Sequence, residues 1–277
     1  MTTLAKRALL VLWSLVFWSL AFTWMLVGAV SSILLLVVGF PYPKVHMWVT
    51  APIFKRVIQV SLTRMHLHYH PDFDPERRSV FGQNHVNLLD GHLASWAIPH
   101  AFSGLMNAWQ FKIPIYGWLM SMSKGIPVKR GRRDETIKQI SDEARKRREI
   151  GMSVLTFPEG HRTLDGKIRP FRRGVFLMAR NAGYPFVPIA AKGMIDVNRK
   201  GTWIFNPFVR VDVFIGPQFE TEGLEDTEIA DLAKRLHDWT VYCIEHGRWP
   251  DDAKPDEPKA ANDAGDDERP TATSASR

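Results

Sequence analysis

His85 and Asp90 stand five positions apart in the stretch NHVNLLDG, just after a short apolar run. An imidazole can act as a general base, and a carboxylate bonded to one ring nitrogen fixes the tautomer and stabilises the cation formed on proton uptake. Such a base activates a hydroxyl group and contributes about 10²–10⁴ in rate. A purely structural alternative is that Asp90 caps a helix beginning at His92 and that the residues before it form a simple turn.

A second group of polar residues, FPEGHR (157–162), also follows an apolar run. Pro158 and Gly160 predict a tight turn that directs Glu159 and Arg162 away from the end of a strand. The guanidinium of Arg162 presents a planar fork of donors that suits a phosphate. The carboxylate of Glu159 can accept a hydrogen bond from a substrate hydroxyl or orient an arginine. The alternative is an ordinary turn closed by a salt bridge.

Strand-like and helix-like segments alternate around these two motifs. The predicted strands are 79–83, 124–131, 153–157, 186–191 and 209–216, and the predicted helices are 92–102, 134–151, 172–183 and 226–247. The helix 134–151 has acids in its first turn, bases late and a glycine at its end, as the helix dipole and C-cap favour. This alternation predicts an α/β domain built on a mixed or mostly parallel sheet flanked by helices.

The N-terminal stretch 8–40 carries no charged residue. As one straight helix it would run about 50 Å, whereas a bilayer core needs about 20 residues. It is therefore either a strongly tilted helix or a hairpin of two helices broken near Gly28 or the serine pair 31–32. Basic residues on both flanks favour a hairpin with both ends on the cytoplasmic side. A cleaved signal peptide is the alternative, but its apolar run is usually about half as long.

These patterns divide the chain into three parts. Residues 1–65 are predicted to be N-terminal membrane-anchoring helices, residues 66–250 the folded domain, and residues 251–277 a disordered acidic tail. Within the first part, 44–65 mixes aromatic and aliphatic residues with spaced bases. It either lies along the lipid headgroups or docks on the domain as an amphipathic helix.

Charge is distributed unevenly along the chain. Residues 1–250 contain 32 bases and 21 acids, and the tail contains four bases and eight acids. A basic body implies a negatively charged partner, namely nucleic acid, an anionic membrane surface or a phosphorylated substrate. No helix-turn-helix, zinc-finger or ribonucleoprotein motif occurs in the sequence, so we expect no nucleic acid. A membrane-anchored anion or nucleic-acid binder without catalytic activity is the rival from another class.

Other potentially reactive residues favour structural roles. Cys243 is the single cysteine, so no internal disulfide forms, and its helical setting indicates a structural thiol. The histidines at 66, 68 and 70 alternate along a predicted strand and could share one face. A polar strand face is the preferred interpretation over a metal site, because neither a cysteine nor a carboxylate cluster completes a ligand set.

The order NH-x4-D and then FPEG-x-R resembles the PlsC-like glycerolipid acyltransferase family, whose members include 1-acyl-sn-glycerol-3-phosphate (lysophosphatidic acid) acyltransferases. The resemblance spans residues 79–193 and includes weaker matches at KGIPVKRG (124–131), PFRRGVFLMA (170–179) and VPIA (187–190). It implies an enzyme of phospholipid biosynthesis that transfers an acyl group from a thioester of coenzyme A or acyl carrier protein to a lysophospholipid hydroxyl. With lysophosphatidic acid as acceptor, the product is phosphatidic acid.

The resemblance also implies roles for individual residues. His85 would be the base and Asp90 its orienting partner. The predicted acceptor-binding residues are Arg130, Glu159, Gly160 and Arg162. No metal, cofactor or covalent intermediate is implied, and backbone N–H groups near His85 are candidates for stabilising the oxyanion.

Two positions depart from the family pattern and leave the acceptor open. His161 stands where threonine or serine is usual, and Lys129 stands where an acidic or small polar residue is common. A lyso-ornithine lipid, another lysophospholipid or glycerol 3-phosphate therefore remains an alternative acceptor. The expected partners are membrane lipids, and the expected location is the cytoplasmic face of the cell membrane.

Overall fold

A computed structural model describes residues 3–113, 116–129 and 131–250 of the chain. The strands are β1 (Arg64–Tyr69), β2 (Val80–Gln83), β3 (Phe102–Asn107), β4 (Ile126–Val128), β5 (Ser153–Thr156), β6 (Phe186–Lys192) and β7 (Arg210–Ile215). The longer helices are α1 (Thr3–Val37), α3 (Ala51–Val60), α4 (Asp90–Ala97), α5 (Tyr116–Met122), α6 (Arg133–Glu149), α7 (Arg173–Asn181) and α9 (Asp226–His246). The short helices are α2 (Tyr42–Val45), the π-helix η1 (His46–Thr50), the 3₁₀ helix η2 (Ala108–Lys112) and α8 (Met194–Val197).

Within the described part of the chain the strands form one sheet in the order β1-β7-β6-β2-β5-β3-β4. Neighbouring strands are parallel except for β6 and β7, which are antiparallel. The prediction of a mixed, mostly parallel sheet flanked by helices is thus confirmed. Because side chains alternate along a strand, Val80 and Phe81 of β2 enter different cores on the two faces of the sheet.

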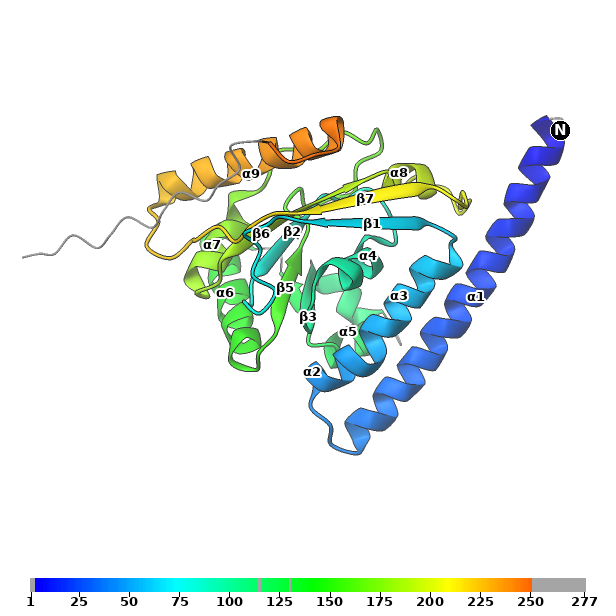
Figure 1. Cartoon of the computed structure of the whole chain (residues 1–277). Helices are drawn as coiled ribbons and strands as arrows, with labels where there is room; N and C mark the ends of the chain where they lie inside the picture. The colour runs from blue at the N-terminus through cyan, green and yellow to red at the C-terminus, as the bar shows by residue number, and fades with distance from the viewer. Residues whose placement is uncertain (1–2, 114–115, 130, 251–277) are drawn as a thin grey trace, which may run out of the picture.

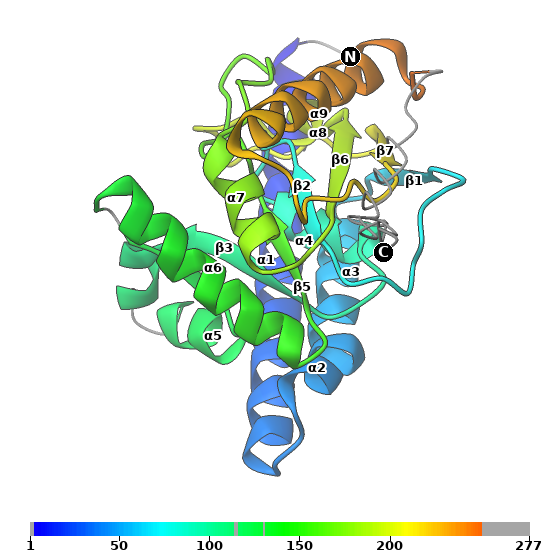
Figure 2. The same cartoon turned by 90° about the vertical axis from the view of Figure 1, so that its left-hand side faces the viewer.

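Helices cover both faces of the sheet. Figure 1 shows α9 across one side and the α1–α3 pair on the other. The face toward α9 packs against α6, α7 and α9, whereas the opposite face packs against α4, α3 and the middle of α1. Figure 2 shows α5 and α6 on the β3 side of the molecule, away from β1 and β7. The strand ends that carry the two polar motifs therefore lie near the middle of a layered α/β domain.

The N-terminal apolar segment forms one unbroken helix, so of the two alternatives the single helix is the one found and the hairpin favoured by the basic flanks is wrong. Gly28 lets α1 approach α3 closely, since a Cβ there would lie 3.0 Å from side-chain atoms of Ile53. The chain reverses only after α1, at Gly39 with φ +97° and at Pro41. It then returns along α1 as α2, η1 and α3 (Figure 1), and α3 docks between α1 and α4. Residues 44–60 are therefore docked on the domain.

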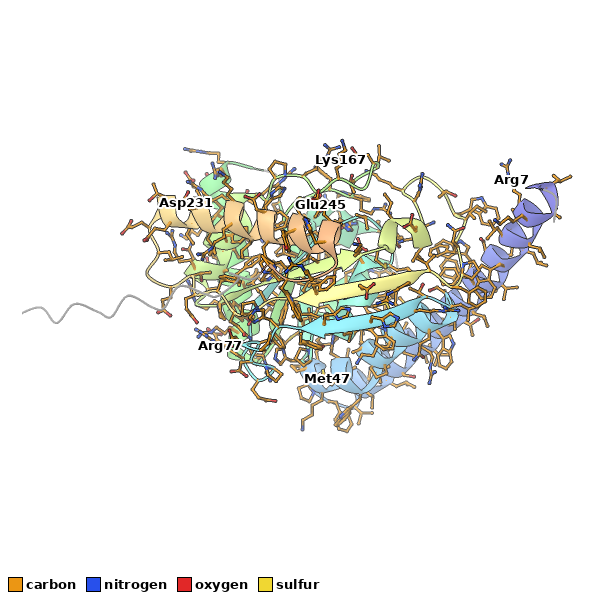
Figure 3. All side chains as sticks on the ribbon, turned by 45° about the horizontal axis from the view of Figure 1, so that its top comes forward. Arg7, Met47, Arg77, Lys167, Asp231 and Glu245 are labelled. Atoms are coloured by element: carbon orange, nitrogen blue, oxygen red, sulfur yellow. The ribbon has the colours of Figure 1, made fainter. Side chains whose placement is uncertain are left out.

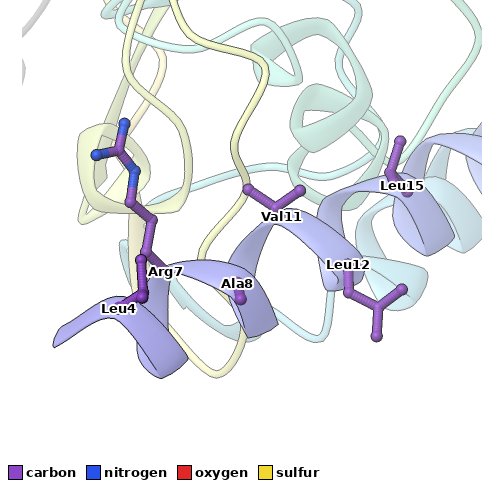
Figure 4. A pocket seen from close by; sticks show the side chains of 6 residues that line it. All are labelled: Leu4, Arg7, Ala8, Val11, Leu12 and Leu15. Atoms are coloured by element: carbon purple, nitrogen blue, oxygen red, sulfur yellow. The ribbon is translucent and has the colours of Figure 1, made fainter. Parts of the chain in front are cut away.

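Helix α1 is the one described helix long and apolar enough to cross a membrane, over Leu4–Val37. Its middle packs on the domain through Phe17, whose ring centroid lies 4.1 Å from that of Phe205. Its first turns project beyond the sheet, and Figure 3 shows Arg7 at that outer end. The surface hollow drawn in Figure 4 is lined only by residues of α1, so it is the exposed flank of the helix itself. Most of the apolar surface of α1 is thus exposed, because the described part of the protein buries only a small share of it.

The helix predicted over 92–102 is only partly correct, because the segment contains the end of one helix and the start of a strand. Helix α4 begins at Asp90 and ends at Ala97, and β3 begins at Phe102. Pro99 explains the break, because a proline restricts the residue before it to extended backbone, and Ile98 has φ −94° and ψ 118°. Strand β3 was missed because FSGLMN contains a glycine and lacks β-branched residues.

The structure also places the residues for which structural roles were preferred. His68 on β1 bonds Asp212 on β7 through Nε2 at 2.9 Å and stacks on Phe214. Cys243 is buried in α9, and burial raises the pKa of its thiol to about 12. A thiol kept protonated in an apolar core is inert as a nucleophile.

The contact between β2 and β6 yields a stability prediction. A Cβ on Gly82 would lie 2.3 Å from a ring carbon of Phe186, so Gly82→Ala overpacks the core and lowers the free energy of unfolding by about 1–3 kcal/mol. Gly104→Ala in β3 is the matched control, since its Cβ would meet only Met106 at an ordinary 3.8 Å. Denaturant titration in detergent measures both variants. Equal stability of the two would contradict the packing described for β2.

Candidate active site

His85 lies in the loop between β2 and α4, at the carboxyl end of a central strand, where α/β sheets usually bind ligands. Asn84 fixes the start of this loop, because its side chain donates to the Ala191 carbonyl at 3.2 Å and accepts from the Ala191 N–H at 2.7 Å. Asn87 fixes the middle of the loop by donating to the carbonyls of Met194 and Asn198. The asparagines of the NHVN stretch therefore hold the histidine loop against β6 and α8.

Asp90 is fully buried at the start of α4 and bonds the histidine. Its Oδ2 accepts from His85 Nδ1 and from the N–H groups of Val86 and Asn87, each at 2.8 Å. A carboxylate can only accept, so Nδ1 carries the proton and Nε2 keeps its lone pair for a ligand. The carboxylate bonds residues upstream of α4, and the helix has no side-chain cap, so the helix-cap alternative is wrong.

Glu159 supports the histidine loop from the second motif. Its Oε1 accepts from the His85 N–H at 2.7 Å and its Oε2 accepts from the Arg169 N–H at 2.8 Å. Burial raises the pKa of Glu159, although these two backbone donors oppose the shift. Gly160 follows with φ +78°, which makes the tight turn that the sequence predicts. The carboxylate of Glu159 thus joins the two motifs behind the site.

The ring of His85 is held on a third side by Phe157. The two rings are stacked, with centroids 3.9 Å apart and planes 14° from parallel. Together with the Asp90 bond, this stack defines both the plane and the rotation of the imidazole. The N–H groups of His85, Val86 and Asn87 are all engaged by carboxylates. These three N–H groups are therefore not free to stabilise an oxyanion, and the expectation of an oxyanion donor elsewhere near His85 stays a prediction.

His85 lines a cavity of about 1070 Å³. Its basic lining residues, which we call the cationic wall, are Lys129, Arg133, Arg162, Arg172 and Arg173, and its imidazoles are those of His46, His85, His92 and His161. Another part of the lining is apolar and includes Met25, Ile53, Phe54, Phe102, Leu105, Leu119, Met120 and Met122. A site with one charged region and one apolar region fits an amphiphilic ligand that carries a negative head and a hydrocarbon chain.

The sequence-predicted residues divide into three groups. His85, Gly160 and Arg162 line the cavity, whereas Asp90 and Glu159 lie behind them and bond the histidine loop. Arg130 lies outside the described residues. Their roles in catalysis and acceptor binding stay predictions.

Several cavity residues were not predicted from the sequence. The ring of Phe157 faces the histidine, and His46 and His92 line the cavity from η1 and α4. Burial lowers the pKa of His92 to about 4. The position of Phe157, directly before the predicted turn at Pro158 and Gly160, could have indicated that it lies near the site. His46 had no such signal, since it lies about 40 positions from His85 and reaches the cavity only through the docking of η1.

Residues 64–192 match the profile of the Acyltransferase family. A 1-acyl-sn-glycerol-3-phosphate acyltransferase of Limnanthes douglasii is 28% identical over 163 residues, which are 59% of this chain and 58% of the relative. One of Pseudomonas aeruginosa is 33% identical over 127 residues, 46% of this chain and 49% of the relative. The matched part thus spans about half the length of these relatives.

A solved structure has the same fold. The crystal structure of the 1-acyl-sn-glycerophosphate (LPA) acyltransferase PlsC from Thermotoga maritima aligns with a TM-score of 0.73 at 20% identity, and covers 88% of this chain and 99% of that one. Residues 64–192 therefore resemble an acyltransferase domain, and the described part of the chain has the fold of the Thermotoga maritima enzyme. The chain is thus similar to the PlsC-like group of acyltransferases over the part that carries both motifs.

The raised pKa of Glu159 predicts a pH dependence of stability. The folded state binds this proton more tightly than the unfolded state, so the stabilisation is largest at low pH and is lost as pH rises from about 4.3 through the folded pKa. The difference in unfolding free energy between the unaltered chain and Glu159→Gln should therefore shrink from about pH 4 to about pH 7. Urea titrations across this range measure it.

Glu143→Gln is the matched control of opposite sign. A hydrogen bond from Lys146 lowers the pKa of Glu143, so its contribution to stability is lost as pH falls through the folded pKa. The corresponding difference for this variant should therefore grow with pH. If the difference in unfolding free energy changed with pH in the same direction for both variants, the account of Glu159 would be refuted.

Proposed function

We propose that the chain transfers a fatty acyl group from a thioester, carried by coenzyme A or acyl carrier protein, to the hydroxyl of lysophosphatidic acid, giving phosphatidic acid. One observation carries the proposal: His85, with Nδ1 held by Asp90, lines a cavity that has both cationic and apolar walls. The relatives named 1-acyl-sn-glycerol-3-phosphate acyltransferases support the same reaction. A lyso-ornithine lipid or another lysophospholipid is the alternative acceptor.

The geometry supports direct transfer without a covalent enzyme intermediate. The free Nε2 of His85 takes the proton of the acceptor hydroxyl while the oxygen attacks the thioester carbonyl carbon. The tetrahedral species collapses, the carbon–sulfur bond breaks, and the imidazolium returns its proton to the departing thiolate. Asp90 bonds Nδ1 throughout and stabilises the positive ring. Phe157 and Glu159 act as positioning residues, through the ring face and the loop backbone respectively.

The cationic wall would bind the acceptor phosphate. Arg162 and Arg172 line the cavity close to the Gly160 turn, since a Cβ on Gly160 would lie 2.6 Å from the guanidinium carbon of Arg172. Two guanidinium groups in a partly enclosed site favour a phosphate dianion through charge-assisted hydrogen bonds. Arg130 is retained as a proposed phosphate ligand from the sequence pattern alone.

Helix α1 would hold the domain at the membrane surface. Only 11% of its most hydropathic window is buried inside the protein. Basic residues lie at 6 and 7 near its start and at 44 after its end, and Arg56 of α3 lies over the ring of Trp24. Met25, Gly28 and Ser32 of this helix also line the cavity. A lipid chain could therefore enter the site directly from the bilayer. We keep the cytoplasmic face of the cell membrane as the proposed location, because lysines and arginines beside membrane segments are enriched on that side.

Thiol release from an acyl thioester tests the proposal against a panel of lysophosphatidic acid, lysophosphatidylcholine, lyso-ornithine lipid and glycerol 3-phosphate. Lysophosphatidic acid should give the largest stimulation. Arg162→Ala should raise its KM about tenfold to a hundredfold, because a charged hydrogen bond contributes about 1.5–3 kcal/mol. Its effect on a lysolipid without a phosphate monoester should be smaller.

Arg145→Ala is the control for lost positive charge, since Arg145 pairs with Asp142 and bonds the Asn181 carbonyl outside the cavity. It should leave the KM for lysophosphatidic acid unchanged. Preference for lyso-ornithine lipid would select the alternative acceptor. Salt-sensitive binding of nucleic acid or anionic vesicles, with no thiol release for any acceptor, would favour the non-catalytic rival.

A further inference from the structure

Two loops beside α1 hold exposed apolar side chains on strained backbone. Leu62, which follows the end of α3, has φ +58°, and Phe208, which lies just before β7, has φ +63°. Both residues are in the left-handed region, where glycine is the usual residue because a Cβ crowds the backbone. Leu62 is 38% exposed and Phe208 is 59% exposed. Burial therefore does not explain why large apolar residues occupy these two positions.

Backbone hydrogen bonds join the two loops into one unit, which we call the apolar tip and define by Leu62 and Phe208. The Phe208 N–H donates to the Leu62 carbonyl at 3.1 Å, and the Arg64 N–H donates to the Val209 carbonyl at 2.8 Å. These bonds continue the pairing of β1 with β7 into the loops. The two strained residues are therefore held side by side at one fixed point of the fold.

The loop that carries Phe208 packs directly on the middle of α1. The Trp203 carbonyl accepts from Trp18 Nε1 at 2.9 Å, and the Phe205 N–H donates to Ser14 Oγ at 3.0 Å. Figure 1 shows the end of α3 and the start of β7 next to this part of α1. Trp203 is itself 46% exposed. Exposed apolar residues thus occur both on α1 and on the loop that contacts it.

The charges around the apolar tip suit an anionic surface. Residues 57–71 and 198–211 contain no acid, and their bases are Arg64, Arg199, Lys200 and Arg210. The guanidinium of Arg64 lies over the ring of Phe208, 6.0 Å from its centroid. Arg210 pairs with Asp212, so the net positive charge comes from the other three bases. Aromatic and apolar side chains beside bases are typical of a membrane–water interface.

A contact at the apolar tip would also orient the candidate active site. Lys200, in the loop that carries Phe208, donates through Nζ to the Arg162 carbonyl at 3.0 Å, and Arg162 lines the cavity. A single helix lying in lipid leaves the attached domain free to turn about the helix axis. A second contact away from that axis removes this freedom and so determines how the cavity faces the bilayer.

We propose that the apolar tip is a second membrane contact, which inserts Leu62 and Phe208 among the headgroups of an anionic bilayer while Arg64 and Arg199 pair with lipid phosphates. This inference rests on the proposed location of α1 in the membrane and is independent of which acceptor is acylated. The left-handed backbone at both positions directs an apolar side chain toward lipid. Glycine would relieve the strain but would provide no side chain to insert.

Spin labels measure the depth of the tip in vesicles of equal parts phosphatidylcholine and phosphatidylglycerol. Cys243 is buried, so the thiol introduced by Phe208→Cys takes the label in the full chain. The ratio of collisions with oxygen, which concentrates in lipid, to collisions with a water-soluble nickel chelate should be severalfold higher there than at Ile150→Cys. Ile150 is the matched control, 45% exposed at the end of α6 on the other face of the sheet.

Two results of the labelling would overturn the proposal. Equal collision ratios at the two positions would place the tip in water. A label on Phe208→Cys that is shielded from both reagents would mean that protein, such as a second copy of the chain, covers the tip. Leu62→Cys provides the same measurement if Phe208→Cys does not fold.

Glycine variants separate membrane contact from folding. Leu62→Gly and Phe208→Gly relieve the left-handed strain, so each should unfold at an equal or higher urea concentration than the unaltered chain. Acyl transfer to lysophosphatidic acid in the vesicles should nevertheless fall by about threefold to tenfold, as expected for losing one partly buried apolar side chain. Transfer in detergent micelles should not change, and Ile150→Gly should keep the vesicle activity.

The outcomes distinguish this inference from the proposed function. Full vesicle activity in both tip variants would overturn the second membrane contact while acyl transfer stands. If no thioester is used in micelles or in vesicles, the proposed function is wrong, and the depth of the label still decides whether the tip enters lipid.

Discussion

A single carboxylate oxygen organises the histidine site. Oδ2 of Asp90 accepts three hydrogen bonds, from the ring of His85 and from two consecutive backbone N–H groups. A fully buried carboxylate is costly unless it is hydrogen-bonded. All three donors bond Oδ2, while Oδ1 has no partner among the described residues, so the loop is favoured only in a conformation that keeps these three donors together. The same closure turns Nε2 of the histidine toward a ligand. The same hydrogen bonds therefore determine both the stability of the loop and the orientation of the imidazole.

The rest of the fold supplies what this loop needs. The parallel strands β2 and β5 end side by side, so the residues after them meet, and Glu159 bonds the backbone of His85. The turn at Gly160 brings Arg162 to the same cavity. Helices α1 and α3 then provide apolar walls that are continuous with the exposed surface of α1. The imidazole of His85, a set of basic residues and a set of apolar residues are thus brought to one cavity from distant parts of the chain.

The sequence predicted most of the frame that positions the site, because the governing interactions are local. Buried strands such as β5 and β6 are short apolar runs, and α6 carries its charges as the helix dipole favours. Strand β3 was missed because its composition is weak and its place is set by pairing with β5. The hairpin predicted within 8–40 was wrong because Gly28 serves close packing with α3 rather than a break.

The site was predicted in part for the same reason. His85 and Asp90 are near in sequence, so their contact could be expected from spacing. Glu159 contacts His85 across 74 positions, and its backbone partners are invisible in a residue pattern. His46 reaches the cavity only because η1 docks beside β3, which depends on tertiary packing. The contact between residues close in sequence was predictable, whereas the contacts of Glu159 and His46, which depend on tertiary packing, were not.

Replacement of His85 by alanine is the most direct test of the central claim. Thiol release with lysophosphatidic acid should fall by about 10²–10⁴ in kcat, because the variant lacks the proposed general base. Binding of lysophosphatidic acid, measured by equilibrium dialysis in detergent, should persist because the cationic wall is intact. Turnover that remains at the level of the unaltered chain would contradict the assignment of this imidazole as the base.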